Sequence, residues 1–223
     1  MLVIEGINSS LLQEVNDHLF PKNHKNFFII TAFAAFLIIV IVLLSMFWPR
    51  NEMNFIEMGL LGEHKMASGY FPNEDNILSA DSEIKWFIYL HNHLETTQKV
   101  IVRVKLVNST MDIPDDQKHL PSSQIFLIEL PSSLSIDETT LLPFSWSVLE
   151  ATSQEDSINL RRIMINDQAI EVNVSDSINS FRLIFELWVY NSSSQEYEFG
   201  WESEKGLSSS SIYMTFSLAQ IFG

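Results

Sequence analysis

Residues 84–107, IKWFIYLHNHLETTQKVIVRVKLV, decide the fold of this chain. Apolar side chains occupy every second position from Ile84 to Leu90 and again from Val100 to Leu106, and a polar turn at 94–98 separates the two runs. A period of two places alternate side chains on opposite faces, as in a half-buried strand. The stretch therefore predicts two antiparallel strands joined by a short turn.

Runs with the same period recur through the C-terminal part of the chain. They pass through Phe126–Leu130, Leu142–Val148, Phe181–Val189, Tyr197–Trp201 and Ile212–Leu218. Clusters of turn-forming residues separate them. Seven to nine short strands with no long helix between them predict a mainly β protein, an immunoglobulin-like antiparallel β-sandwich. A parallel α/β sheet is excluded because it needs crossover helices.

One N-terminal segment breaks this pattern. Residues 27–48, FFIITAFAAFLIIVIVLLSMFW, carry no charge and span about 33 Å as a helix, which matches the hydrocarbon core of a bilayer. Fifteen of them are Leu, Ile, Val or Phe, which favours insertion by about −5 to −9 kcal/mol. We predict one transmembrane helix that ends before Pro49. A cleaved signal peptide is disfavoured, because the run is too long and lacks a small-x-small cleavage pattern.

Charges beside this segment indicate its orientation in the cell membrane. Lys22 and Lys25 precede it and Arg50 follows it, which favours a cytoplasmic N-terminus. The chain then divides into a cytoplasmic tail (1–26), a transmembrane helix (27–48) and an extracytoplasmic β-sandwich domain (51–223). Within the tail, residues 7–20 have the pattern of a short amphipathic helix, interpreted as a leader on the membrane surface or as a docking helix for another subunit.

Composition narrows the choice of partners. The net charge of −15 lies entirely after Arg50, where 10 Lys/Arg face 25 Asp/Glu. So acidic a surface disfavours nucleic acid and favours cations, basic proteins or a positively charged surface layer. The chain has no cysteine, which excludes disulfides, thiolate metal sites and cysteine nucleophiles. For an external domain, the lack of disulfides indicates a prokaryotic surface.

Several short motifs resemble a family of archaeal membrane proteins whose domain has no known function. They are FIEMGLLG at 55–62, YFP at 70–72, and Asn92-His93 followed by a valine-rich strand at 100–108. Leu94 intervenes where the family has an Asn-His-Glu hairpin, and residues 181–218 match only loosely. The resemblance implies an archaeal source and an external β domain beside membrane helices. It implies no activity and no site residue.

The best candidate metal ligands are His91 and His93. Residues two apart on a strand point to one face, so their imidazoles could bind zinc or copper. Two ligands do not make a site, and His64 and His119 would have to join them from loops. The alternative is a surface pair beside a turn at Asn92-His93. We predict no metal, no cofactor and no enzymatic activity.

Other chemical motifs are weak or missing. Acidic pairs at 74–75, 115–116 and 155–156 lack the spacing of a calcium-binding loop and are interpreted as solvated loops. The sequence contains no phosphate-binding glycine loop, no nucleophile elbow and no HExxH motif.

Two further groups of residues are candidates for modification or for binding. Sequons at Asn108, Asn173 and Asn191 are candidate glycosylation sites if the domain is external. The aromatic residues Trp188, Tyr190 and Trp201 are interpreted as a binding patch or as buried residues of the sandwich.

These observations favour a non-catalytic accessory or structural subunit of a larger archaeal membrane protein complex. Its partners would be membrane lipid and other membrane-protein subunits, and Ala32, Ala34 and Ala35 offer small residues for close helix packing. The alternative is an independent cell-surface adhesion or ligand-binding module in contact with a surface layer.

Overall fold

The computed structural model describes residues 24–47, 55–79, 82–154, 157–200, 202–203, 206–207 and 211–219. The chain forms two compact units, Met1–Glu52 and Met53–Gly223. The amphipathic helix predicted at 7–20 lies outside the described residues, as do the predicted segment end at 48–50, the acidic pair at 155–156 and Trp201.

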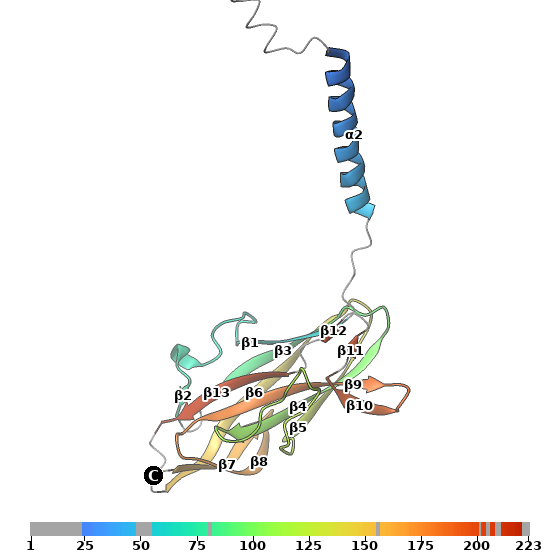
Figure 1. Ribbon diagram of the computed structural model, residues 1–223. Coiled ribbons are helices and arrows are strands. Elements are labelled where there is room, and N and C mark those ends of the chain that lie inside the picture. Colours follow the sequence, from blue (N-terminus) through green and yellow to red (C-terminus); the bar gives the residue numbers. More distant parts are fainter. Residues whose placement is uncertain are drawn as a thin grey trace, which may run out of the picture. The chain divides into compact units, whose positions relative to one another are not determined.

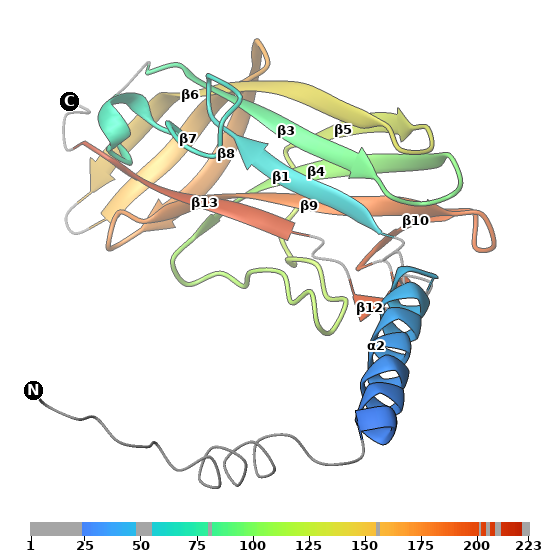
Figure 2. The ribbon, with the colours of Figure 1, turned by 90° about the horizontal axis from the view of Figure 1, so that it is seen from above.

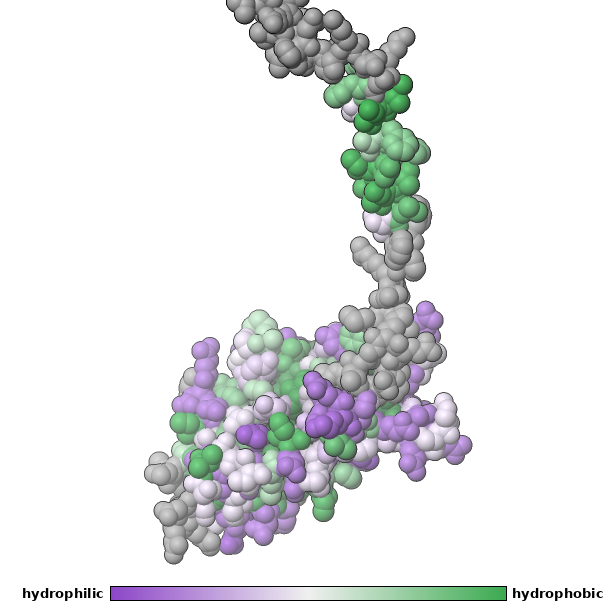
Figure 3. Space-filling model, in the orientation of Figure 1, coloured by the Kyte–Doolittle hydropathy of each residue, from purple (hydrophilic) through white to green (hydrophobic). Residues whose placement is uncertain are grey.

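The first unit contains one long apolar helix, α2 (His24–Phe47). Within it, Phe27–Ser45 is long and apolar enough to cross a membrane, and no residue of this stretch is buried. It forms the continuous hydrophobic run of the helix in Figure 3. The hydroxyls of Thr31 and Ser45 donate to backbone oxygens of the same helix, those of Phe27 and Val42, at 2.9 and 2.7 Å. The predicted apolar helix is confirmed, while its membrane location and its orientation stay predictions.

The second unit is a sandwich of two sheets that pack face to face (Figures 1 and 2). Its elements are β1 (Ile56–Leu61), the 3-10 helix η1 (Pro72–Glu74), β2 (Ile77–Leu78), β3 (Ile84–Asn92), β4 (Gln98–Asn108), β5 (Ile128–Leu134), β6 (Thr139–Gln154), β7 (Ser157–Ile165), β8 (Gln168–Asp176), β9 (Phe181–Asn191), β10 (Glu196–Phe199), β11 (Glu202–Ser203), β12 (Gly206–Leu207) and β13 (Ser211–Leu218).

The pairing of these strands is that of an immunoglobulin-like fold. The first sheet has the order β1-β3-β6-β7-β8 and the second β2-β13-β9-β4-β5, with β10 paired to β9. Only β2 and β13 pair in parallel among the described strands. Strands β1, β3 and β6 correspond to immunoglobulin strands A, B and E, and β4, β9 and β13 to C, F and G. The predicted antiparallel sandwich is confirmed, and the β7-β8 hairpin widens its first sheet.

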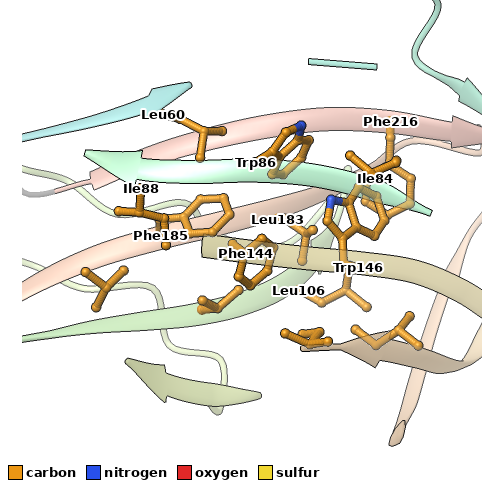
Figure 4. Close-up of a cluster of buried hydrophobic side chains, with 14 of the residues drawn as sticks. Leu60, Ile84, Trp86, Ile88, Leu106, Phe144, Trp146, Leu183, Phe185 and Phe216 are labelled. Atoms are coloured by element: carbon orange, nitrogen blue, oxygen red, sulfur yellow. The ribbon is translucent and has the colours of Figure 1, made fainter. Parts of the chain in front are cut away.

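Alternate residues of β3 build the core, as their spacing predicted. The residues from Ile84 to Leu90 that face inward are buried, and those between them are exposed or half-buried. The Trp86 ring lies between the sheets, with its centroid 5.3 Å from that of Trp146 and 6.0 Å from that of Phe185 (Figure 4). Its indole nitrogen donates to the backbone oxygen of Tyr70 at 2.5 Å. Because Trp146 belongs to the first sheet and Phe185 to the second, Trp86 joins both layers.

Strand β4 is buried on both faces, so the prediction of a half-buried strand was wrong there. On its outward side Ile101, Lys105 and Val107 are 8%, 4% and 0% exposed. The connection at 109–127, which we call the covering loop, lies over this face: the Lys105 ammonium donates to the backbone oxygen of Ser122 at 2.6 Å. In Figure 2 the loop lies on the side of the second sheet away from β1 and β3. It forms a third layer over part of the sandwich.

Phe126 belongs to this covering loop and not to a strand, contrary to the prediction. Strand β5 begins at Ile128. The Phe126 ring lies against the Arg103 guanidinium at 5.2 Å, a contact with the outer side of β4. The apolar alternation therefore starts before the strand pairing does.

Strands β7 and β8 were not predicted. They form a hairpin through Asn166 and Asp167, both with positive φ, of 46° and 63°, as a two-residue type I′ turn requires. The pairing register shifts between Leu160 and Arg162, so a bulge interrupts the alternation of side chains. This break hid the period of two.

Candidate functional site

His91 and His93 lie together at the end of β3. Their ring centroids are 4.0 Å apart and the rings are tilted by 63°. The Nε2 atom of His91 lies 3.3 Å from a carboxylate oxygen of Asp137, and that of His93 lies 3.3 Å from one of Glu57. The Nδ1 atom of His91 is 2.6 Å from the hydroxyl of Thr139. Each imidazole therefore faces its own partners, and the two rings do not converge on one point.

Neither of the other candidate histidines joins this pair. His64 is exposed in the segment after β1, and His119 lies in the covering loop. A zinc site needs three or four ligands around one point. Within the described ranges, no group of three or more His, Asp or Glu side chains is placed to hold a metal ion. This geometry favours the surface-pair interpretation of His91 and His93.

Asn92, between the two histidines, is a structural hub. It is fully buried, and its amide nitrogen lies 2.9 to 3.1 Å from the backbone oxygens of Thr96, Leu134 and Ser135. Its amide oxygen accepts from the backbone nitrogen of Leu94 at 3.0 Å. A buried amide with every group bonded fixes the segments around it. Asn92 ties the β3-β4 turn to the end of β5, in line with the turn role that the sequence indicated.

The covering loop is held by a buried ion pair that the sequence analysis missed. The Lys105 ammonium lies 2.8 Å from a carboxylate oxygen of Glu186, with the side chains 5% and 0% exposed. Glu186 also accepts from the backbone nitrogen of Ser122 at 2.7 Å and from the indole nitrogen of Trp188 at 3.1 Å. A buried pair is stable only when such extra bonds complete it. The sequence did contain a signal of this pair, because Lys105 and Glu186 are each a charged residue inside an apolar run.

Above this ion pair, the covering loop exposes several large apolar side chains. They are Ile113, Leu120, Ile125 and Phe126, and Ile125 is 86% exposed. The tip of the loop is closed by the backbone nitrogen of Asp115, which donates to the oxygen of Leu120 at 2.8 Å. An ordered loop that displays several apolar side chains is typical of an interaction surface.

An open pocket of about 560 Å³ lies beside His119, between the covering loop and β10. Its lining consists of His119, Pro121, Trp188, Asn191, Tyr197, Glu198, Phe199 and Gly200. Hydrogen bonds from Asn191 and Ser194 hold the pKa of Glu198 below its ordinary value. Gly200 has a φ of 68°, and a Cβ there would overlap the His119 ring, so the wall needs glycine at this point.

Trp188 is not a free aromatic platform. The Arg103 guanidinium lies 3.9 Å from its ring centroid, and the Phe199 ring lies at 5.7 Å. Tyr190 packs edge-on against Tyr197 at 5.3 Å. Of the predicted aromatic patch, Trp188 and Tyr190 thus make contacts inside the domain.

The carboxylates of the acidic loops that the structure describes accept hydrogen bonds from within the domain. The hydrogen bond from Lys118 holds the pKa of Asp115 below its ordinary value. Asp116 accepts from the hydroxyl of Ser211 at 2.9 Å, and Asp75 accepts from the backbone nitrogen of Ile77 at 3.1 Å. Asp75 and Asp115 thus bond within their own turns, whereas Asp116 bonds to strand β13, and the solvated-loop interpretation stays a prediction.

Comparison with known proteins identifies no family and only distant structural likenesses. No known protein family and no characterised protein of similar sequence matches this chain. A CARDB domain from Pyrococcus furiosus, in complex with di-metal ions, has a TM-score of 0.36 and 9% identity, covering 75% of this chain and 90% of that one. A mutant β-glucosidase from Listeria innocua, in complex with laminaribiose, has a TM-score of 0.34 and 9% identity, covering 75% and 16%. These likenesses are too distant to argue for a function.

Proposed function

We propose that the protein is a non-catalytic accessory or structural subunit of a larger membrane protein complex, in an archaeal cell membrane. Helix α2 anchors it with the N-terminus in the cytoplasm, and the sandwich lies outside. The observation that carries this proposal is the covering loop, which is fixed from beneath by the Lys105–Glu186 pair and exposes Ile125 and its apolar neighbours. Its partners are membrane lipid and neighbouring subunits.

The energetics of the loop support an interface. A 19-residue connection (109–127) without strands of its own is uncommon in a compact domain and is usually functional. Burying an exposed Ile or Phe side chain against a partner contributes about 1.5–3 kcal/mol. A loop that is already ordered adds little entropy cost when it binds.

The test is copurification of the full-length chain from its native membrane in mild detergent. We expect neighbouring subunits to copurify with the wild type, and Ile125→Asp to lose them. Ile178→Asp is the matched control, because Ile178 is 70% exposed and belongs to the turn between β8 and β9, not to the covering loop. A wild-type chain that elutes as a monomer, or equal copurification by both variants, would contradict the proposal.

A second candidate is an independent cell-surface adhesion or ligand-binding module, which the open pocket beside His119 favours. Its wall offers Tyr197, Glu198 and Asn191, a mixture of aromatic and polar groups that suits a polar ligand. This candidate predicts that the detergent-solubilised chain binds cell-wall or surface-layer material without other subunits. Tyr197→Ala would weaken that binding, whereas Ile125→Asp would leave it unchanged.

A further inference from the structure

The edge strand β8 carries two partial protections against pairing with another strand, the exposed charge of Glu171 and the bulge in its pairing with β7. Among the described strands it pairs only with β7, and it is nine residues long. An open edge is a template for another chain, and proteins commonly guard it with Lys or Pro. Strand β8, QAIEVNVSD, has neither, whereas β5 at the edge of the second sheet carries Pro131.

One end of β8 is covered by the chain that leaves β4. The amide nitrogen of Asn108 donates to the backbone oxygen of Ser175 at 2.7 Å. The backbone nitrogen of Ser109 donates to the carboxylate of Asp176 at 2.7 Å. These bonds leave the part of the edge before Ser175 without cover from the described residues.

Asn173 lies where this cover ends. In β8, Ile170, Val172 and Val174 pack against the core, so the residues between them face outward. Asn173 is one of these exposed residues, and in the described part of the chain its amide makes no hydrogen bond. Its sequon is completed by Ser175, which is also exposed.

The other two sequon asparagines are used by the fold. The amide nitrogen of Asn108 clamps Ser175, and its oxygen accepts from the backbone nitrogen of Thr110 at 3.0 Å. The amide nitrogen of Asn191 lies 2.9 Å from both carboxylate oxygens of Glu198. A sugar on either nitrogen would replace one of its hydrogens and crowd these partners.

We propose that Asn173 is the N-glycan acceptor of this domain and that the glycan covers the free edge of β8. The inference rests on the external location of the domain in the proposed function. In this modification the Nδ2 atom of Asn173 loses a proton and forms a bond to the anomeric carbon of an oligosaccharide. The bond between that sugar and a lipid-linked phosphate breaks. The large hydrophilic group then excludes a pairing strand.

The first experiment measures occupancy on the full-length chain, translated into microsomes that glycosylate a control sequon. Asn173→Gln and Ser175→Ala should lose the whole mass increment of the wild type, while Ser175→Thr, Asn108→Gln and Asn191→Gln should retain it. An unmodified wild type, or an increment that survives in Asn173→Gln, overturns the proposal. Protease digestion of intact microsomes distinguishes the possible reasons for a missing glycan. A protected domain without glycan leaves the orientation standing, whereas a digested domain refutes the external location as well.

The second experiment uses full-length protein produced in cells that glycosylate it but lack its native partner subunits, and measures its self-association in mild detergent by sedimentation. Asn173→Gln should form oligomers whose fraction rises with protein concentration, while the glycosylated wild type stays at its lowest mass. Asn173→Lys also lacks the glycan but places a charge on the edge, so it should behave like the wild type. Equal behaviour of Asn173→Gln and wild type would show that the glycan does not guard the edge.

Discussion

Replacing Lys105 by Met would leave the Glu186 carboxylate buried without its counter-charge. Because these side chains are 5% and 0% exposed, water cannot replace the lost partner. Removing one member of such a pair costs about 3–5 kcal/mol. In a domain of this size each kcal/mol lowers the Tm by about 2–4 °C, so Lys105→Met should lower it by about 6–20 °C.

The measurement is thermal unfolding of the full-length chain in detergent, followed by circular dichroism. Arg162→Met is the control, since the Arg162–Glu150 pair at 3.2 Å is 43% and 41% exposed and contributes less than about 1 kcal/mol. The double variant Lys105→Met/Glu186→Leu should lose less stability than the sum of its single changes, because no unpaired charge remains. Equal shifts for Lys105→Met and Arg162→Met would refute the buried ion pair.

Three further predictions concern the stability of the same domain. Trp86→Ala should cost about 3–5 kcal/mol in chemical denaturation, because it opens a cavity between the sheets; a loss below that of Tyr213→Ala, at a half-exposed ring, would contradict its central role. Burial raises the pKa of Asp176, but hydrogen bonds donated by Ser109 and by backbone nitrogens outweigh it and hold that pKa below 3.8. The stabilisation by the Asp176 carboxylate is therefore present above pH 3.8 and is lost as pH falls through the folded-state pKa. Asp176→Asn should lower the free energy of unfolding at pH 7 but not at the acid end of the range; a difference that does not change with pH would argue against this. Asn92→Ala should cost about 2–4 kcal/mol, since several buried backbone groups lose their partner; a neutral result in the same denaturation assay would remove Asn92 as a hub.

The sequence predicted best where one face of a strand meets the core and the other meets water. In β3 the period of two from Ile84 to Leu90 gave both the strand and its inward face. It failed in β4, because the covering loop buries the outward side, and that burial depends on a contact with distant Ser122. The β7-β8 hairpin was missed because its bulge breaks the period, although Asn166-Asp167 carried a usable turn signal.

For the candidate site, the sequence predicted that the two histidines lie close together but not which groups their ring nitrogens face. Spacing alone placed His91 and His93 side by side, and the structure confirms that their rings are in contact. The partners that occupy the ring nitrogens, Asp137 and Glu57, come from other segments, so no local pattern announced them. The same holds for Glu186 beneath the covering loop, whose partner Lys105 is far away in the chain.

The hydroxyls of Thr31 and Ser45 donate to backbone oxygens of their own helix, so the stretch Phe27–Ser45 of α2 offers a neighbour mainly hydrocarbon. Contacts between such surfaces depend on shape and make no directional bonds. An apolar helix of equal length that keeps the small residues at 32, 34 and 35 should therefore replace α2 without loss of assembly. The sandwich domain would then select the right neighbour, and helix α2 would mainly hold the protein in the membrane.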